Sequence, residues 1–316
     1  MNITILDKPT FTVGDINLEK LNSLGEVSYY DILSREDVIK ACYNSPIVIC
    51  NKTLFDKDMI NSLPNLKYIG LTATGYNTVD LKVASEKGIV VTNVPGYSTV
   101  DVSEHVFAFI LHHANKIDVY DSTVKRGDWI KSETFCYFNY PLTELFGKTL
   151  GIIGFGSIGK RVAEIAKAFG MRVLVYTRTK PENSPYEIVD KETIFSESDY
   201  LTIHSPLNEQ TKNLINRETL SLMKKSAVLI NTARGPGVDE NALKDALNNG
   251  VISHAYLDVL CVEPMSKDCP LLDAKNLTIT PHIAWAPKES RQRLIDIVAS
   301  NVQAFLDGKS QTVVNK

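Results

Sequence analysis

The stretch from Gly147 to Gly170 constrains the fold of this chain more than any other part of the sequence. It opens with a short apolar run, Thr149 to Ile153, typical of a strand that is buried on both faces of a parallel sheet. Gly154, Gly156 and Gly159 follow in the pattern G-x-G-x-x-G, and apolar residues then recur at helical spacing as far as Gly170. A strand, a glycine turn and a helix in this order predict a dinucleotide-binding unit.

Each glycine of this pattern has a physical role in binding a dinucleotide. Gly154 permits the tight turn, Gly156 lets a pyrophosphate approach the backbone, and Gly159 brings the helix close to the strand. Ser157 and Ile158 begin the helix, where unpaired backbone N–H groups face an anion. The alternative is a glycine-rich turn without a ligand, which the flanking strand and helix disfavour.

The end of the next strand, Arg172 to Tyr176, indicates which dinucleotide is bound. An Asp or Glu at this point would hold the ribose 2′-hydroxyl of NAD. The sequence continues instead with Thr177, Arg178, Thr179 and Lys180, none of which is acidic. A guanidinium matches the geometry of a phosphate, so Thr177 with Arg178 and Lys180 favours NADP(H), and NAD(H) is the alternative if these residues form only a solvated turn.

Composition excludes several classes of protein. The 316 residues suffice for two domains, and a net charge of −3 gives no electrostatic case for binding nucleic acid or an anionic membrane. No apolar run has the length of a membrane span, and the first residues, MNITILDKPT, lack the basic region followed by an apolar one that is typical of a signal peptide. Five cysteines without a C-x-x-C pair suit a reducing compartment, so we expect a cytoplasmic protein.

Strand-like and helix-like segments alternate along the chain, which predicts parallel sheets covered by helices. Buried strands are expected at residues 2–6, 46–51, 66–71 and 88–92, with helices at 18–24 and 35–41. A long apolar helix at 102–119 contains three histidines, His105, His112 and His113, which lack partners at metal-ligand spacing and are expected to pack in the core or on the surface rather than bind a metal. An aromatic-rich loop at 135–140 is expected to form a subunit contact or a substrate lid.

From Gly147 onward six strands are expected, at residues 149–153, 172–176, 200–204, 227–231, 253–259 and 277–280. The last helix, at about 289–305, has no strand to follow it and is expected to pack on the first domain. The predicted fold is therefore α/β with two doubly wound parallel sheets, in which a Rossmann dinucleotide-binding domain (99–287) is inserted into a flavodoxin-like substrate domain (1–98 and 288–316).

Ligands of an open parallel sheet bind beyond the carboxyl ends of its strands, so these ends are the places to search for chemistry. Arg234 follows one strand within a glycine-rich turn, Glu263 follows the next, and His282 follows the last. Reduction of a 2-keto acid needs a cation for the carboxylate, a proton donor and a hydride. Arg234 would hold the carboxylate and polarise the carbonyl, and His282 would be the acid/base. Glu263, hydrogen-bonded to His282, would favour the protonated imidazole. Taken separately, each could be structural, but together they favour catalysis.

The sequence resembles the D-isomer-specific 2-hydroxyacid dehydrogenase family over essentially its whole length. The matching stretches are TGYNTVD (74–80), NVPGYSTVDVSEH (93–105), GFGSIG (154–159), HSPL (204–207), INTARG (230–235), LDVLCVEP (257–264) and TPHIAWA (280–286). Two stretches, PHIAWA and FCYFNYPLTELFGKTLGI, are similar to the glycerate dehydrogenase (hydroxypyruvate reductase) branch.

The resemblance implies roles for individual residues. Arg234, Glu263 and His282 match the family's catalytic residues, and Thr74 and Gly75 match backbone donors to the substrate carboxylate. Asp258 would lie on the nicotinamide side, and the cofactor site would also include His204, Pro206 and Thr232. The family further implies a homodimer formed through the region 102–140.

The resulting expectation is an enzyme that interconverts hydroxypyruvate and D-glycerate with NAD(P)(H). The alternatives are reduction of glyoxylate, reduction of pyruvate to D-lactate, reduction of a bulkier 2-keto acid or, in a different class, a non-catalytic nucleotide-sensing interaction protein. The presence of Arg234, Glu263 and His282 does not exclude such an interaction protein, but the absence of long disordered tails disfavours it.

Overall fold

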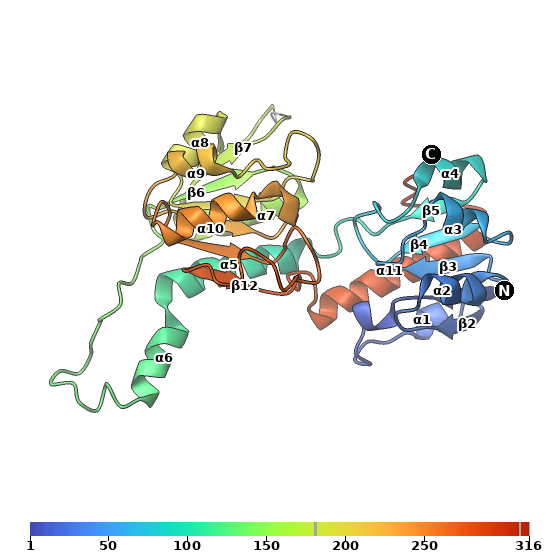
Figure 1. Ribbon diagram of the computed structural model, residues 1–316, viewed down its shortest axis with the longest axis horizontal. Helices are drawn as coiled ribbons and strands as arrows, with labels where there is room; N and C mark the ends of the chain where they lie inside the picture. The colour runs from blue at the N-terminus through green and yellow to red at the C-terminus, as the bar shows by residue number, and fades with distance from the viewer. Residues whose placement is uncertain (180–181, 310, 316) are drawn as a thin grey trace. The chain divides into compact units, whose positions relative to one another are not determined.

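The computed structural model describes residues 1–179, 182–309 and 311–315. The chain forms two compact units, which are labelled here the first unit (Met1–Ser98 with Trp285–Lys316) and the second unit (Thr99–Ala284). Each unit contains one sheet whose strands are all parallel, with helices on its faces (Figure 1). This architecture confirms the predicted fold class.

The sheet of the first unit has five strands in the order β2-β1-β3-β4-β5, which is the flavodoxin-like order. They are β1 (Asn2–Ile5), β2 (Glu26–Tyr29), β3 (Ile47–Cys50), β4 (Tyr68–Leu71) and β5 (Val90–Thr92). Successive residues of β3 enter different cores, because Ile47 and Ile49 pack on one face while Val48 and Cys50 pack on the other. Helices of this unit are α1 (Glu19–Asn22), α2 (Arg35–Cys42), α3 (Lys57–Asn61) and α4 (Leu81–Glu86).

The last helix, α11 (Lys288–Leu306), packs on the sheet of the first unit although it follows the second unit in sequence. Phe305 lies against Tyr68 of β4, with ring centroids 4.8 Å apart. At its other end Arg291 donates two hydrogen bonds of 2.7 Å to the carboxylate of Asp15, and the arginine side chain is only 13% exposed. Apolar burial and a bidentate ion pair thus hold α11 in the first unit.

The sheet of the second unit has seven strands in the order β12-β11-β10-β9-β6-β7-β8. They are β6 (Thr149–Ile153), β7 (Arg172–Tyr176), β8 (Glu187–Ile188), β9 (Tyr200–Ile203), β10 (Val228–Asn231), β11 (His254–Leu257) and β12 (Leu277–Ile279). The helices are α5 (Thr99–Asn115), α6 (Ile117–Lys125), α7 (Ser157–Ala168), α8 (Lys191–Glu197), α9 (Arg217–Leu222) and α10 (Glu240–Asn248). Strand β6 lies between β7 and β9, so the glycine turn that follows it occupies the switch point of the sheet.

Three elements differ from the sequence prediction. Strands β2 and β8 were not predicted, because both lie at a sheet edge and are half exposed, which removes the continuous apolar run of a buried strand. The expected long helix is two helices, since Lys116 adopts the left-handed conformation (φ 47°) between α5 and α6. A left-handed residue interrupts the helical hydrogen-bond ladder and redirects the chain.

Helix α6 and the connection to β6 extend away from the remainder of the second unit (Figure 1). This segment, residues 117–144, is called the arm. Several of its large apolar side chains are highly exposed, with Ile130 at 88%, Phe135 at 89% and Phe138 at 77%. Across the part of the chain that the structure describes, no helix is both long and apolar enough to cross a membrane.

Candidate active site

Packing requires glycine at two of the three positions in the turn after β6. A Cβ on Gly154, whose φ is +91°, would lie 2.6 Å from the backbone N of Ser205. A Cβ on Gly159 would lie 2.3 Å from the carbonyl oxygen of Gly154. A Cβ on Gly156, by contrast, would meet no atom within 4 Å, so this face of the turn is open to a ligand.

The groups around this turn fit a dinucleotide. Gly156 is the N-cap of α7 and provides no side-chain hydrogen bond, so the N–H groups at Ser157 and Ile158 remain donors for an anion. Thr232, at the end of β10, is only 9% exposed, and its hydroxyl has no hydrogen-bond partner among the described residues. A buried hydroxyl of this kind is expected to find a partner when a ligand binds.

The other predicted cofactor residues also follow strand ends of the second unit. His204 follows β9, and its Nε2 lies 3.0 Å from the hydroxyl of Thr202. Burial lowers the pKa of His204 to about 3, so its imidazole is neutral near pH 7. Thr177 and the exposed Arg178 follow β7, whereas Lys180 lies outside the described residues.

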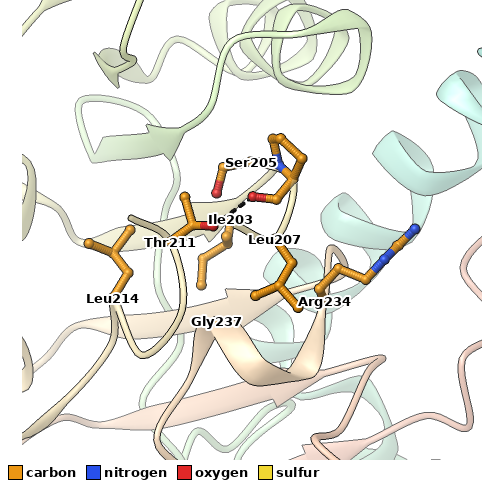
Figure 2. A pocket seen from close by; sticks show the side chains of 8 residues that line it. Ile203, Ser205, Leu207, Thr211, Leu214, Arg234 and Gly237 are labelled. Carbon is orange, nitrogen blue, oxygen red and sulfur yellow. Dashed lines mark hydrogen bonds between the residues drawn. The ribbon is translucent and has the colours of Figure 1, made fainter. Parts of the chain in front are cut away.

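Arg234 lies beside a small hollow that Pro206 and residues after β9 and β10 also line. The Thr211 hydroxyl donates to the carbonyl oxygen of Pro206 across this hollow, and Figure 2 shows the guanidinium of Arg234 extending away from the other side chains drawn. Its Nη1 donates to the carbonyl oxygen of Ala233 at 2.7 Å. Arginine has five N–H donors, and this bond uses one of them, so several remain that could bind a carboxylate.

The turn that carries Arg234 is held from both sides. The buried Asn231 donates to the carbonyl oxygen of Arg234 at 3.0 Å and accepts from the N–H of Ala233. A Cβ on Gly235 would lie 1.9 Å from the carbonyl carbon and oxygen of Leu260. Glycine at this position therefore lets the Arg234 turn pack against the loop that leads to Glu263.

His282 and Glu263 form a hydrogen-bonded dyad. The Nδ1 atom of His282 lies 2.7 Å from Oε2 of Glu263, and Oε1 of the same carboxylate accepts from the N–H of Leu260 at 3.0 Å. Both side chains are about one-third exposed, at 30% and 31%. Because a carboxylate can only accept, the Nδ1 atom of His282 carries the hydrogen of this bond, and the carboxylate orients the ring.

The carboxylate of Asp258 is 1% exposed and faces the backbone around His282. Its Oδ1 accepts from the Thr280 hydroxyl at 2.6 Å and from the N–H of Ile283 at 2.9 Å, while Oδ2 accepts from the N–H of Ala284 at 2.9 Å. The expectation that Asp258 lies toward the nicotinamide remains a prediction.

Thr74 and Gly75 belong to the first unit and follow β4. The Thr74 hydroxyl donates to the carbonyl oxygen of Val94 at 2.9 Å, and the side chain of Asn93 donates to the carbonyl oxygen of Thr74 at 2.7 Å. These bonds hold the backbone of the loop in one conformation.

Within the second unit, the structure brings Arg234, Glu263 and His282 to the ends of the neighbouring strands β10, β11 and β12. The contributions of Asn231 and Thr280 were not predicted from the sequence, and His105 was expected only to pack. Hydroxyl and amide side chains next to a strand end were the only signal for the first two. Among the described residues, no group of three or more His, Cys, Asp or Glu side chains is arranged to hold a metal ion.

A doubly wound sheet with a glycine turn at its switch point and a histidine–carboxylate pair at its strand ends defines the class of dinucleotide-dependent oxidoreductases. The family described as D-isomer specific 2-hydroxyacid dehydrogenase, NAD binding domain, matches residues 107–284. The chain belongs to the D-isomer-specific 2-hydroxyacid dehydrogenase family and is an oxidoreductase.

Known relatives are similar over the full length of the chain. The hydroxypyruvate reductase of Blautia hydrogenotrophica is 41% identical and covers 100% of both chains. The glycerate dehydrogenase of Methylorubrum extorquens is 42% identical over 99% of this chain and 98% of the relative. These relatives confirm the family predicted from the sequence and its similarity to the glycerate dehydrogenase branch.

Solved structures show the same architecture. The TT0316 protein of Thermus thermophilus is 33% identical with a TM-score of 0.90, covering 99% of this chain and 100% of that chain. The NADPH-dependent glyoxylate/hydroxypyruvate reductase of Sinorhizobium meliloti, in complex with NADP and malonate, is 28% identical with a TM-score of 0.85, covering 99% and 96%. The neighbours thus include a protein that binds NADP, whereas the matched family description names NAD.

Proposed function

We propose that the protein reduces a small 2-keto acid, preferably hydroxypyruvate, to the corresponding D-2-hydroxy acid, D-glycerate, and catalyses the reverse reaction. The observation that supports this proposal most directly is the His282–Glu263 dyad of 2.7 Å at a strand end beside that of Arg234. The names of the two full-length relatives support the substrate.

In this proposal the side chains divide the chemistry between them. When bound, the reduced dinucleotide supplies the hydride that adds to the keto carbon. His282 holds a proton at Nε2 and donates it to the carbonyl oxygen, so that one hydride and one proton add across the double bond. Glu263 accepts from Nδ1 and stabilises the protonated ring before transfer. Arg234 holds the substrate carboxylate through paired N–H donors.

The two units have separate tasks in the proposed enzyme. Residues 1–98 and 288–316 form the substrate domain, in which the backbone N–H groups of Thr74 and Gly75 bind the substrate carboxylate. Residues 99–287 form the dinucleotide-binding domain, in which the glycine turn, Ser157 and Ile158 bind the pyrophosphate. Asn93 donates a hydrogen bond to the carbonyl oxygen of Thr74, and the Thr74 hydroxyl donates one to Val94. These bonds support the role of the Thr74 loop in binding the carboxylate, because they fix its conformation before the substrate binds.

We assign NADP(H) as the preferred cofactor. Arg178 follows β7 and is exposed, and Thr177 beside it donates only a long bond of 3.5 Å to the carbonyl oxygen of Thr179. Both side chains can therefore turn to a 2′-phosphate at little energetic cost. An arginine fork matches the geometry of a phosphate, and no carboxylate stands at Thr177 or Arg178 to repel it.

We further assign a homodimer formed through the region 102–140, which includes most of the arm, and a cytoplasmic location. The exposed Ile130, Phe135 and Phe138 support the dimer, since side chains of this kind are characteristic of an interface core. All five cysteines are unpaired thiols, which is consistent with a reducing compartment.

The test of the proposed function is the initial rate of reduction of hydroxypyruvate, glyoxylate and pyruvate, each with NADPH and with NADH. We expect hydroxypyruvate with NADPH to give the highest kcat/KM. His282→Ala should lower kcat by about a thousandfold while the dissociation constant of the cofactor stays unchanged. Arg234→Ala should chiefly raise KM, by about a hundredfold, and Arg217→Ala, at an exposed arginine paired with Asp245, is the matched control. Unchanged turnover by His282→Ala would exclude this mechanism. A higher kcat/KM with glyoxylate or pyruvate than with hydroxypyruvate would show that hydroxypyruvate is not the preferred substrate, while the family assignment would stand.

A further inference from the structure

His282 has a backbone conformation that needs support from its surroundings. Its φ is +55°, which is uncommon for a residue other than glycine, so neighbouring contacts must offset the strain of this backbone. Its N–H donates to the carbonyl oxygen of Asp258 at 2.8 Å. The next two N–H groups, of Ile283 and Ala284, both donate to the Asp258 carboxylate. Asp258 is therefore the anchor of the segment that carries His282.

A third side chain completes this anchor. Oδ1 of Asp258 accepts two bonds, from the N–H of Ile283 and from the Thr280 hydroxyl at 2.6 Å. The Thr280 hydroxyl also lies 3.2 Å from Nε2 of His105, which belongs to α5, 175 residues earlier in the chain. A hydroxyl has one hydrogen, and that of Thr280 points to Asp258. Thr280 can therefore only accept from His105, so Nε2 of His105 is the protonated nitrogen.

The surroundings of His105 favour this neutral donor. Its side chain is 20% exposed and meets Phe109 edge to face, with ring centroids 4.4 Å apart. Burial lowers the pKa of His105 below its ordinary value, against the opposing attraction of the Asp258 carboxylate 3.8 Å away. At neutral pH the ring is therefore a hydrogen-bond donor with a fixed orientation.

We propose that His105 is a positioning residue for the reaction, because its Nε2–H orients the Thr280 hydroxyl on Asp258 and thereby holds the His282 segment in its left-handed conformation. The directed chain runs His105 → Thr280 → Asp258, and the backbone N–H groups of Ile283 and Ala284 donate to its end. His105 touches no reacting atom in this role. The inference rests on the proposed function only where His282 is the acid/base, since the structural link itself is independent of the substrate.

The experiment compares two substitutions at this site with a control on the same helix. His105→Gln retains an N–H donor near the position of Nε2, whereas His105→Leu keeps the bulk and removes the donor. His112→Leu removes a histidine that contacts Tyr256 and Asp118 instead. Two readouts are measured on the full-length protein: amide hydrogen exchange of the peptide covering residues 280–286, and steady-state kinetics with hydroxypyruvate and NADPH.

We expect His105→Leu to speed amide exchange in 280–286 and to lower kcat about tenfold at unchanged KM and unchanged melting temperature. His105→Gln should restore both values, and His112→Leu should change neither. Unchanged exchange in His105→Leu would overturn the inference, whatever the kinetics, and so would equal loss in the Gln and Leu variants. If the unmodified protein reduces no 2-keto acid but exchange still responds to His105→Leu and is restored by Gln, the proposed function fails while the positioning link stands.

Discussion

The two oxygens of the Glu263 carboxylate have different partners: Oε2 lies 2.7 Å from Nδ1 of His282, and Oε1 accepts from the N–H of Leu260. The second bond fixes the carboxylate, and the fixed carboxylate then fixes the imidazole ring. Gly235 packs against the carbonyl of the same Leu260, so the turn that carries Arg234 rests on the loop that orients Glu263. Leu260 therefore contacts both the turn that carries Arg234 and the carboxylate that orients His282.

Substitution of Glu263 tests the contribution of this carboxylate. In Glu263→Gln the amide can still accept from Nδ1 but no longer carries the charge that stabilises a protonated ring. We expect kcat for keto-acid reduction to fall about tenfold or more, with cofactor binding retained. Glu240→Gln is a matched control, because the Glu240 carboxylate accepts from the N–H of Cys261 at 2.7 Å in the same region. Equal loss in both variants would indicate a disturbed loop rather than a lost charge.

Cofactor preference should depend on Arg178. We expect Arg178→Ala to lower kcat/KM with NADPH about tenfold and to leave the value with NADH nearly unchanged, since only NADPH carries the 2′-phosphate. Arg161→Ala, at an exposed arginine of α7 paired with Glu164, should affect the two cofactors equally. A wild-type preference for NADH would show that Thr177 and Arg178 form a solvated turn.

The oligomeric state should depend on the arm. Phe135 and Phe138 are 89% and 77% exposed, and their burial in a dimer would remove a large apolar area from water. We expect light scattering to give twice the mass of one chain, and Phe135→Ser combined with Phe138→Ser to shift the protein toward the monomer. Val13→Ser, at an equally exposed apolar residue of the first unit, is the control. A monomeric wild-type protein would contradict the assignment.

Stability should fall on acidification, and two neighbouring histidines of the second unit should contribute to this loss. His113 and His254 lie with ring centroids 5.5 Å apart, and burial is the main cause that lowers the pKa of each from 6.5 to about 4. Between these values the unfolded chain binds protons that the folded chain does not. The contribution of these two neutral histidines to the free energy of unfolding is therefore fully present above about pH 6.5 and decreases as the pH falls toward 4. Thermal unfolding at about pH 7 and about pH 5 should show a lower melting temperature at the acidic pH, and a smaller drop for His254→Gln. An equal drop in the two proteins would exclude His254 as a contributor.

Much of the fold could be predicted from local patterns. The buried strands of the second unit are continuous apolar runs, and the glycine turn between β6 and α7 has the characteristic pattern G-x-G-x-x-G, so both could be predicted. The edge strands β2 and β8 were missed because half-exposed residues lack such a run. The break at Lys116 was missed because a lysine in the left-handed conformation has no characteristic neighbour in sequence.

The candidate site was predictable only in part. Arg234, Glu263 and His282 could be proposed because each follows a predicted strand and their residue types suit one reaction. A hydrogen bond between Glu263 and His282 was also expected, and the two atoms lie 2.7 Å apart, whereas the contact of Gly235 with Leu260 is a property of the assembled loops. The link from His105 to Thr280 spans 175 residues, and no spacing rule connects a helix position with a strand end so far along the chain.

The sequence by itself determined the class of fold, the family and the residue types available for catalysis, because hydrophobic periodicity and glycine spacing act within a few residues of one another. The tertiary structure alone decided which nitrogen of His105 carries its hydrogen, which nitrogen of His282 faces Glu263, and how Asp258 holds a strained backbone. These features depend on hydrogen-bond directions among groups that meet only after the strands are ordered in the sheet. Hydrogen bonds require close distances and angles, and such geometry exists only in the packed state.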